Sequence, residues 1–340
     1  MIIRSKAPLR IGLAGGGTDV SPYSELYGGA ILNGTISMYA YATIEPRSDG
    51  KIVFDAIDRG VRLGFNAEKA LKLNGELDLL KGIYNRIVKD FTNESLSFTL
   101  STFVDAPPGS GLGTSSTLVT AIVGAFSEWL ALPLGEYDVA KLAYDIERVD
   151  LLMAGGKQDQ YAATFGGINF MEFGSDGKVI VNPLRIKTKI LNELAYNIVL
   201  YYTETSRLSS KIIEAQQQNV NSNNVRSIEA MHALKHVAIE MKETLLKGSL
   251  DKIGMLLDKS WQFKKQMALG ISNPLIDDIY ATAMKAGATG GKISGAGGGG
   301  FMFFYCPGNT RHAVIEALGK FGGQAKRYQF TKNGMVSWTI

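Results

Sequence analysis

The chain has 340 residues, of which 45% are hydrophobic and 20% charged, which is typical of a globular protein large enough for two packed domains. Its 36 basic and 32 acidic side chains leave a net charge of +4, too weak a bias to indicate nucleic-acid binding. The single cysteine, Cys306, excludes an intrachain disulfide and favours a reducing, cytoplasmic location. The sequence predicts no signal peptide and no membrane-spanning helix.

Strand-like and helix-like segments are mixed in both halves of the chain. In the first half, β-branched and aromatic residues predict strands over 2–11, 31–44, 96–100 and 166–173 and a hairpin over 51–65, while apolar spacing predicts helices over 77–91, 115–130 and 136–152. In the second half, strands are predicted over 196–203, 290–294, 300–305 and 324–330, and helices over 208–219, 224–247, 249–269, 274–286 and 310–321. This mixture predicts an α+β fold with domains at 1–185 and 186–340.

The glycine-rich segment 107–116, Pro-Pro-Gly-Ser-Gly-Leu-Gly-Thr-Ser-Ser, has the most distinctive chemistry. It lies between a predicted strand and a predicted apolar helix. Its glycines free the backbone to wrap around an anion, and the helix N-terminus supplies unpaired N–H groups. The hydroxyls of Thr114, Ser115 and Ser116 are suited to capping the helix, binding phosphate or ligating Mg²⁺.

Two common phosphate-binding motifs do not fit the spacing. A dinucleotide-binding fingerprint needs a third glycine where this segment has Thr114. A Walker A loop needs Gly-Lys followed by Ser or Thr, but the Gly-Lys pairs at 156–157 and 291–292 are followed by Gln158 and Ile293. The segment is therefore neither of these two motifs.

Three segments together resemble the three motifs of the GHMP kinases, the family of galactokinase, homoserine kinase, mevalonate kinase and phosphomevalonate kinase. They are 7–19 (Ala-Pro-Leu-Arg-Ile-Gly-Leu-Ala-Gly-Gly-Gly-Thr-Asp), 107–116, and 292–301 (Lys-Ile-Ser-Gly-Ala-Gly-Gly-Gly-Gly-Phe). They occur in the family's order and span nearly the whole chain. The resemblance implies a two-domain fold, with an N-terminal domain like ribosomal protein S5 domain 2 and a ferredoxin-like C-terminal domain.

The resemblance also implies an ATP site with Mg²⁺. The ATP phosphates would be held by Pro108, Gly109, Ser110, Gly111, Leu112, Gly113, Thr114, Ser115 and Ser116. Ser115 matches the family's metal-ligating serine, and Glu147 matches the carboxylate that ligates the same ion. Taken without the family, Glu147 is simply a helix glutamate exposed to solvent.

The resemblance also implies two catalytic residues. Asp159 would accept the proton of the attacking hydroxyl or orient that hydroxyl, and Arg10 would be a fixed cation near the reacting centre. These two residues are equally compatible with a plain ion pair. Further acceptor-binding positions are Gly16, Gly17, Thr18 and Asp19 in the first motif and Gly297 and Gly298 in the third. The glycine run 295–300 is also suited to close packing on the nucleotide loop, or to a simple turn between strands.

The Gly-Gly-Gly-Thr-Asp form of the first motif is more similar to heptose-7-phosphate kinases and fucokinases than to galactokinases. It implies phosphorylation of an anomeric hydroxyl, with a heptose 7-phosphate as the expected acceptor. A free-sugar kinase, a non-catalytic ligand sensor and an isoprenoid-acid decarboxylase are the alternatives on the same fold. The partners expected are small molecules, with no nucleic acid and no membrane, and the oligomeric state stays open.

A phosphorylated acceptor needs a second anion site in addition to the ATP loop. Arg207 and Lys211 stand four residues apart at the start of a predicted helix, so both would lie on one face of it. The same spacing also fits a capped helix with two solvated cations. The sequence therefore offers this pair as the candidate site for the acceptor's phosphate.

Overall fold

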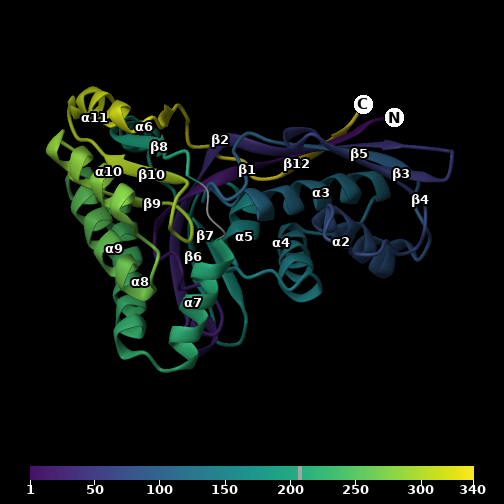
Figure 1. The fold of residues 1–340 in the computed structure, drawn as a ribbon, viewed down its shortest axis with the longest axis horizontal. Coiled ribbons are helices and arrows are strands. Elements are labelled where there is room, and N and C mark those ends of the chain that lie inside the picture. The colour runs from purple at the N-terminus through teal and green to yellow at the C-terminus, as the bar shows by residue number, and fades with distance from the viewer. Residues whose placement is uncertain (206–208) are drawn as a thin grey trace.

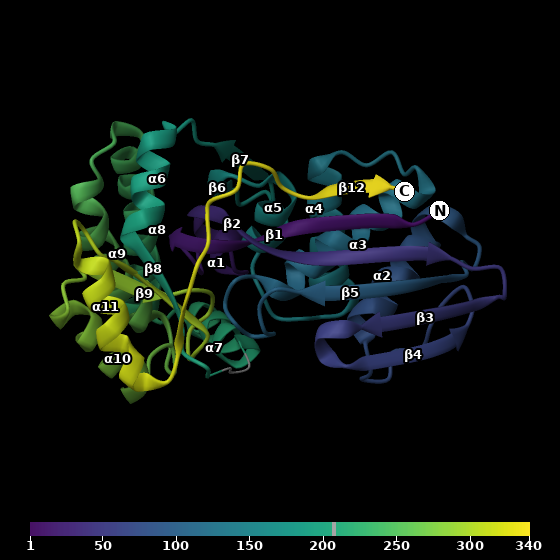
Figure 2. The ribbon, with the colours of Figure 1, turned by 90° about the horizontal axis from the view of Figure 1, so that it is seen from above.

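A computed structural model describes residues 1–205 and 209–340. The chain forms two lobes, one built mainly by the first half around an eight-stranded sheet and the other by the second half around a four-stranded sheet (Figures 1 and 2). The predicted α+β class is confirmed. In the described part of the chain, no helix is both long and apolar enough to cross a bilayer.

The large sheet has the strand order β12-β1-β2-β5-β3-β4, and β6 and β7 extend it from β2. Its pairs are antiparallel except for β3 and β5, which run parallel. The strands are β1 (Ile3–Ala14), β2 (Gly29–Pro46), β3 (Lys51–Ala56), β4 (Val61–Asn66), β5 (Phe98–Val104), β6 (Ile168–Phe173), β7 (Val179–Pro183) and β12 (Val336–Thr339).

Strand β2 is 18 residues long and changes partner along its length. Its first part, Gly29–Gly34, pairs with β6, and its last part, Ala40–Pro46, pairs with β5. The neighbouring β1 is irregular between Pro8 and Arg10 and between Gly12 and Ala14. Such bulges re-aim side chains. Here they flank Arg10 and Gly12, which both line the cleft described below.

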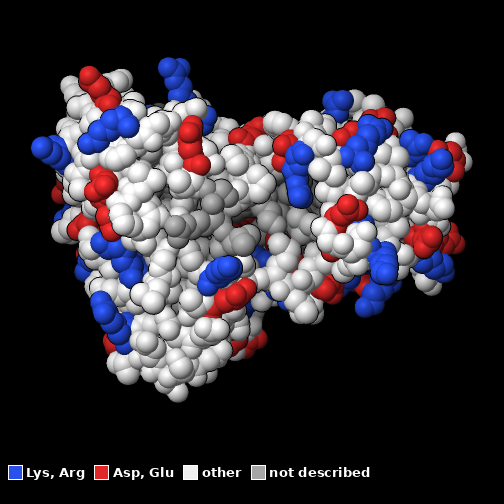
Figure 3. All heavy atoms as spheres, in the orientation of Figure 1, with Lys and Arg blue, Asp and Glu red and all other residues white. Residues whose placement is uncertain are grey.

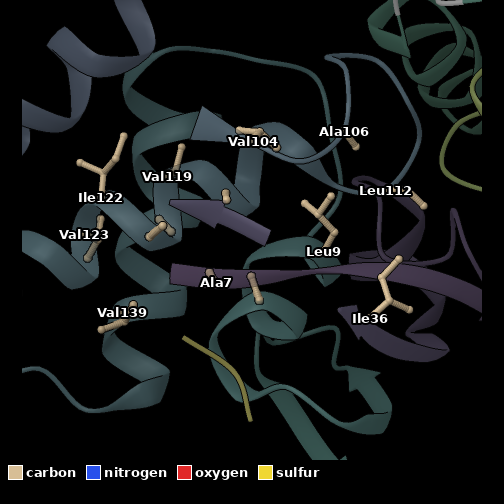
Figure 4. Close-up of a cluster of buried hydrophobic side chains, with 14 of the residues drawn as sticks. Ala7, Leu9, Ile36, Val104, Ala106, Leu112, Val119, Ile122, Val123 and Val139 are labelled. Carbon is tan, nitrogen blue, oxygen red and sulfur yellow. The ribbon is translucent and has the colours of Figure 1, made fainter. Parts of the chain in front are cut away.

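Helices cover one face of this sheet and bury the main core. They are α2 (Asp78–Ile87), α3 (Thr114–Leu130), α4 (Glu136–Asp145) and α5 (Gln158–Phe165). Figure 4 shows Val119, Ile122 and Val123 of α3 gathered with Ala7 and Leu9 of β1. Burying apolar surface stabilises such contacts by about 25 cal/mol per Å². The core therefore fixes the start of α3, where the glycine loop ends.

The small sheet has four antiparallel strands in the order β11-β8-β10-β9. Numbered along the chain, this order is 4-1-3-2, which is that of a ferredoxin-like sheet. The strands are β8 (Ile198–Tyr202), β9 (Gly290–Ile293), β10 (Phe301–Tyr305) and β11 (Gln324–Lys326).

The second half contributes further helices. They are α6 (Thr188–Asn197), α7 (Ser209–Asn221), α8 (Val225–Lys247), α9 (Ile253–Met267), α10 (Pro274–Lys285) and α11 (Thr310–Leu318). Of these, α8 has 23 residues. A core of Trp261, Phe304 and other buried apolar side chains joins these helices to the small sheet. Cys306 is buried within the same core, where burial raises the pKa of its thiol to about 12.

The chain returns to the large sheet after β11. Residues 327–335 run beside β2, where Phe330 forms a bridge with Ile36, and β12 then pairs with β1 so that Ile3 faces Thr339. The yellow C-terminal segment follows this path across Figure 2. Residues beyond 326 thus contact the first half of the chain. The predicted division at 185 stays a prediction.

Most predicted elements are present, with shifts at their ends, but several short ones were not predicted. These are α1 (Tyr23–Tyr27), α5, α6, β7 and β12. The predicted helix 136–152 is also irregular, because α4 ends at Asp145 and a wider π-type turn follows over Ile146–Asp150. Such turns are frequent at functional sites.

Candidate active site

A cleft of about 680 Å³ lies where the three glycine-rich segments meet. Its walls include Gly12 of β1, residues of the turn that follows β1, residues of the glycine loop and of the first turn of α3, and two residues of the third segment, Gly295 and Ala296. Helices α7 and α9 close it from the second half of the chain through Gln216 and Lys264. A pocket of this size is ordinary for small-molecule sites.

The loop before α3 has the backbone of an anion site. Gly109, Gly111 and Gly113 have φ values of 74°, 84° and 80°, a left-handed conformation that glycine adopts without strain. α3 begins directly after Gly113, and no side chain caps its N-terminus. Its first N–H groups and the positive end of its dipole are therefore available to a phosphate.

The third glycine segment packs directly on this loop. A side chain at Gly295 would meet the backbone of Gly111, and one at Gly300 would collide with that of Ser110. The Ser294 hydroxyl donates a hydrogen bond to the carbonyl of Gly111 at 2.9 Å, and the Phe301 N–H donates to that of Ser110 at 2.8 Å. These contacts hold the loop in one conformation, so the anion site is preorganised.

Arg10 and Asp159 meet beside the loop. The Arg10 guanidinium makes two contacts of 2.7 Å to Asp159 Oδ1, and its third nitrogen donates to the Gly111 carbonyl at 2.6 Å. A Cβ on Gly113 would lie 3.0 Å from the Asp159 carboxyl carbon, so the carboxyl group is in contact with the loop. Arg10 is 4% exposed and Asp159 is 21% exposed, which leaves the carboxylate open to the cleft.

Ser115 and Glu147 meet on the other side of the loop. The Ser115 hydroxyl donates to Glu147 Oε1 at 2.9 Å, and Gln160 donates to Glu147 Oε2 at 2.6 Å. The Glu147 side chain is completely buried, and the Arg148 guanidinium lies 3.7 Å from it. The turn over Ile146–Asp150 places Glu147 and Arg148 together at the cleft wall.

This donor set fits a magnesium ion. Mg²⁺ prefers oxygen ligands, binds through one or two carboxylates, and completes its shell with water and nucleotide phosphates. Ser115 and Glu147 supply a hydroxyl and a carboxylate that converge at the loop. The described residues hold no cluster of three or more His, Cys, Asp or Glu that would suggest a metal site of another kind.

Asp19 lies in the cleft wall and is held by the backbone. Its Oδ2 accepts hydrogen bonds from the N–H groups of Lys157 at 2.9 Å and Gln158 at 3.0 Å. Burial raises the pKa of Asp19, the hydrogen bond from Gln158 lowers it, and the nearby charge of Asp159 raises it again. Asp19 is thus a fixed hydrogen-bonding group that lines the cleft near Asp159.

Replacing Gly156 by alanine is expected to displace Asp19. The new Cβ would collide with Asp19 Oδ2, the atom that the two backbone N–H groups hold. If Asp19 binds the acceptor, KM for the acceptor should rise by roughly tenfold or more, the loss of one to two hydrogen bonds to a charged group, while KM for ATP changes little. Gly64→Ala is the matched control, because nothing lies within 4 Å of a Cβ at Gly64. Equal changes in both KM values would argue against a role for Asp19 in acceptor binding.

Two buried lysines belong to the same region and were not predicted. Lys264 lines the cleft from α9 and is 3% exposed, and Lys292 of β9 donates to the carbonyl of Gly12 at 3.0 Å. Burial lowers the pKa of Lys264 to about 8, with the charge of Arg10 acting in the same direction and Asp19 opposing it. Burial also lowers the pKa of Lys292 well below its ordinary value, and the charges of Lys264 and Arg10 add to this.

Other predicted site residues are placed less directly at the cleft. Thr18 is buried and bonds to the backbone of Gly15 and Ala30. Gly297 and Gly298 pack against Ile271, whereas Gly295 and Ala296 reach the cleft wall. Of the proposed second anion site, Arg207 lies outside the described residues and the Lys211 side chain is exposed. Their roles stay predictions.

A glycine-rich loop at the open N-terminus of α3, with a carboxylate–arginine pair beside it, is an arrangement that suits phosphoryl transfer. The family described as GHMP kinases N terminal domain matches residues 78–167, and the GHMP kinases C terminal family matches residues 241–324. A protein of Campylobacter jejuni named D-glycero-alpha-D-manno-heptose 7-phosphate kinase is 50% identical over 99% of both chains. The chain therefore belongs to the GHMP kinase family and is a phosphotransferase.

Solved structures agree with this assignment. A structure described as a D-glycero-D-manno-heptose 1-phosphate kinase from Bacteroides thetaiotaomicron is 45% identical, covers 99% of both chains and has a TM-score of 0.84. The galactokinase of Lactococcus lactis, in complex with galactose, has a TM-score of 0.80 over 98% of this chain at 19% identity, which shows a shared fold.

Proposed function

We propose that the protein transfers the γ-phosphoryl group of ATP to the anomeric hydroxyl of D-glycero-D-manno-heptose 7-phosphate and produces the 1,7-bisphosphate. The observation that carries the phosphotransfer is the Asp159 carboxylate, which is bonded to Arg10 and lies against the glycine loop at Gly113. The choice of acceptor is supported by the 50% identity to the Campylobacter jejuni relative over the whole chain.

The reaction needs a proton acceptor and a fixed positive charge at the point of transfer. Asp159 accepts the proton of the attacking hydroxyl as its oxygen forms a bond to the γ-phosphorus, and the bond from that phosphorus to the bridging oxygen of ADP breaks. Arg10 orients the carboxylate and stabilises negative charge on the transferring group. Its bond to the Gly111 carbonyl ties this geometry to the loop.

Binding of ATP is assigned to the loop and to the open N-terminus of α3. Ser115 and Glu147 would hold Mg²⁺, which neutralises charge on the β- and γ-phosphates and helps to orient them. Gln160 and Arg148 keep the Glu147 carboxylate in place. We place the reaction in the cytoplasm, where ATP and the small-molecule acceptor are available.

The experiment that tests this proposal is ADP release with Mg-ATP and a panel of acceptors. The panel contains D-glycero-D-manno-heptose 7-phosphate, the corresponding 1-phosphate, L-fucose, D-mannose and D-galactose. We expect kcat/KM for the heptose 7-phosphate to exceed that for every other acceptor by at least about 10²-fold, since a site that binds an anion penalises its absence by several kcal/mol. Turnover of the 1-phosphate would show that another hydroxyl is phosphorylated, because the anomeric oxygen of that compound already carries a phosphate.

Preference for a free sugar would support the kinase activity but contradict the proposal that the acceptor is phosphorylated. A ligand sensor without turnover is the second candidate, and the absence of ADP release with every acceptor would favour it. The intact Ser115–Glu147 and Arg10–Asp159 pairs favour an enzyme, because a sensor has no need of both.

A further inference from the structure

Lys264 is a buried cation that faces the cleft without a partner. It lies on α9, its exposed fraction is 3%, and it lines the cleft. Among the described residues, none makes a hydrogen bond or ion pair with its ammonium group, although the charge of Asp19 is near enough to raise its pKa. Lysine is almost never buried unless it is paired. The arrangement therefore points to a negative ligand that completes the site.

A second hydrogen-bond donor, Gln158 Nε2, lies near the same glycine as Lys264. An ideal Cβ on Gly16 would be 4.0 Å from Lys264 Nζ and 4.0 Å from Gln158 Nε2. Glycine at this position keeps the space between the two donors open. The Gln158 Oε1 atom is buried and has no hydrogen-bond partner within residues 1–205 and 209–340, so the same carboxamide also offers an acceptor to a ligand hydroxyl.

The charged side chains that line the cleft balance formally, since its four cations, Arg10, Arg148, Lys264 and Lys292, face four carboxylates, Asp19, Glu147, Asp159 and Glu214. The charge of Arg10 lowers the pKa of both Lys264 and Lys292, and the charge of Lys264 also lowers that of Lys292. The neighbouring carboxylates are Asp19 and Asp159. Asp159 is already paired with Arg10, and Asp19 is held by backbone N–H groups. A phosphate beside Gly16 would give Lys264 the anionic partner that these carboxylates do not supply, and would relieve the repulsion among Arg10, Lys264 and Lys292.

We propose that Lys264 and Gln158 bind the phosphate group carried by the acceptor sugar. This inference rests on the proposed function, in which the acceptor is a sugar phosphate. The position favours the acceptor's phosphate over the phosphates of ATP, because both donors converge at Gly16, in the same turn as Asp19. The loop that receives ATP is instead contacted by Arg10, Asp159 and Ser294.

The test is a steady-state comparison of Lys264→Met with Lys265→Met. The two lysines are neighbours on α9, but the Lys265 ammonium lies over the Trp261 ring and does not line the cleft. For Lys264→Met we expect KM for heptose 7-phosphate to rise by about ten- to a hundredfold, the effect of one charge-assisted hydrogen bond. KM for ATP and kcat should stay within about threefold of the wild type, as should every constant of Lys265→Met.

Lys264→Arg supplies a second variant that keeps the positive charge. Lys264→Arg should reverse at least half of the rise in KM for heptose 7-phosphate, measured on a logarithmic scale. Isothermal titration with heptose 7-phosphate and with a non-hydrolysable ATP analogue measures the two affinities without turnover. Circular dichroism and the melting temperature check that each variant is folded.

Each other outcome overturns the inference. A rise in KM for ATP equal to or greater than that for the acceptor assigns Lys264 to the nucleotide, and a fall in kcat with both KM values unchanged assigns it to the transferring group. Constants unchanged from those of Lys265→Met remove it from the site. Wild-type protein that does not phosphorylate heptose 7-phosphate at all removes the proposed function itself, and that result is visible before any variant is compared.

Discussion

Asp159→Asn is expected to lower kcat by roughly 10²- to 10⁴-fold, the usual contribution of a general base. Asparagine has nearly the same shape as aspartate but cannot accept the proton of the attacking hydroxyl. Arg10 keeps its bonds to the Gly111 carbonyl and the Ser294 hydroxyl, so the loop should hold its conformation. The dissociation constant for ATP should therefore change by less than about threefold.

The measurement is ADP release at saturating substrates, together with ATP binding by isothermal titration. Asp55→Asn is the matched control, because Asp55 is also paired with an arginine, Arg62, but lies on β3 away from the cleft. If Asp159→Asn lowered the melting temperature and left kcat within a few-fold of the wild type, the pair with Arg10 would be structural and Asp159 would not be the base.

Glu147→Gln is expected to lower kcat by about 10²-fold at a fixed, low concentration of Mg²⁺. Glutamine keeps the volume of the side chain but removes the charge, and stabilisation by a bound metal is worth several kcal/mol in such reactions. Because the loss is one of metal affinity, part of the activity should return as the concentration of Mg²⁺ is raised. Treatment with EDTA should abolish turnover of the wild type.

The Mg²⁺ dependence of kcat distinguishes this role from a structural one. Glu136→Gln is the control, because Glu136 is exposed at the start of α4, the helix that precedes the turn carrying Glu147. A Mg²⁺ requirement identical to that of the wild type would show that the bonds of Glu147 to Ser115 and Gln160 only hold the loop in place.

The sequence motifs were sufficient to predict which of their residues lie together in the folded chain. Ser115 and Glu147 were predicted as one site and are hydrogen-bonded, and Arg10 and Asp159, predicted as neighbours, form an ion pair. Lys264 could not be predicted in this way. It stands beside Lys265 on a helix, and the sequence does not indicate which of the two adjacent cations faces the cleft, since that depends on how α9 packs on the rest of the molecule.

The fold shows the same limit. Long amphipathic helices such as α3 and α8 and strands such as β2 were predicted from their apolar patterns. The eight-residue helix α5 and the four-residue strand β12 were missed, because elements this short are too short to show a clear hydrophobic periodicity. Their stability comes from contacts made by distant segments. β12 is a strand because β1 pairs with it, and a local pattern does not contain that information.

The pairing of Ile3 with Thr339 has a consequence for synthesis. Residues Ile3–Lys6 of β1 stay unpaired on the β12 side until residues 336–339 have left the ribosome, although the other partner of β1, β2, is made almost at once; β12 then takes the place of β1 as the end strand of the sheet. An open strand edge is a template for pairing with other chains, and closing so long a loop is slow. A nascent chain of this protein therefore carries an exposed edge through most of its translation, and we expect its yield on expression to depend on chaperones that cover such edges.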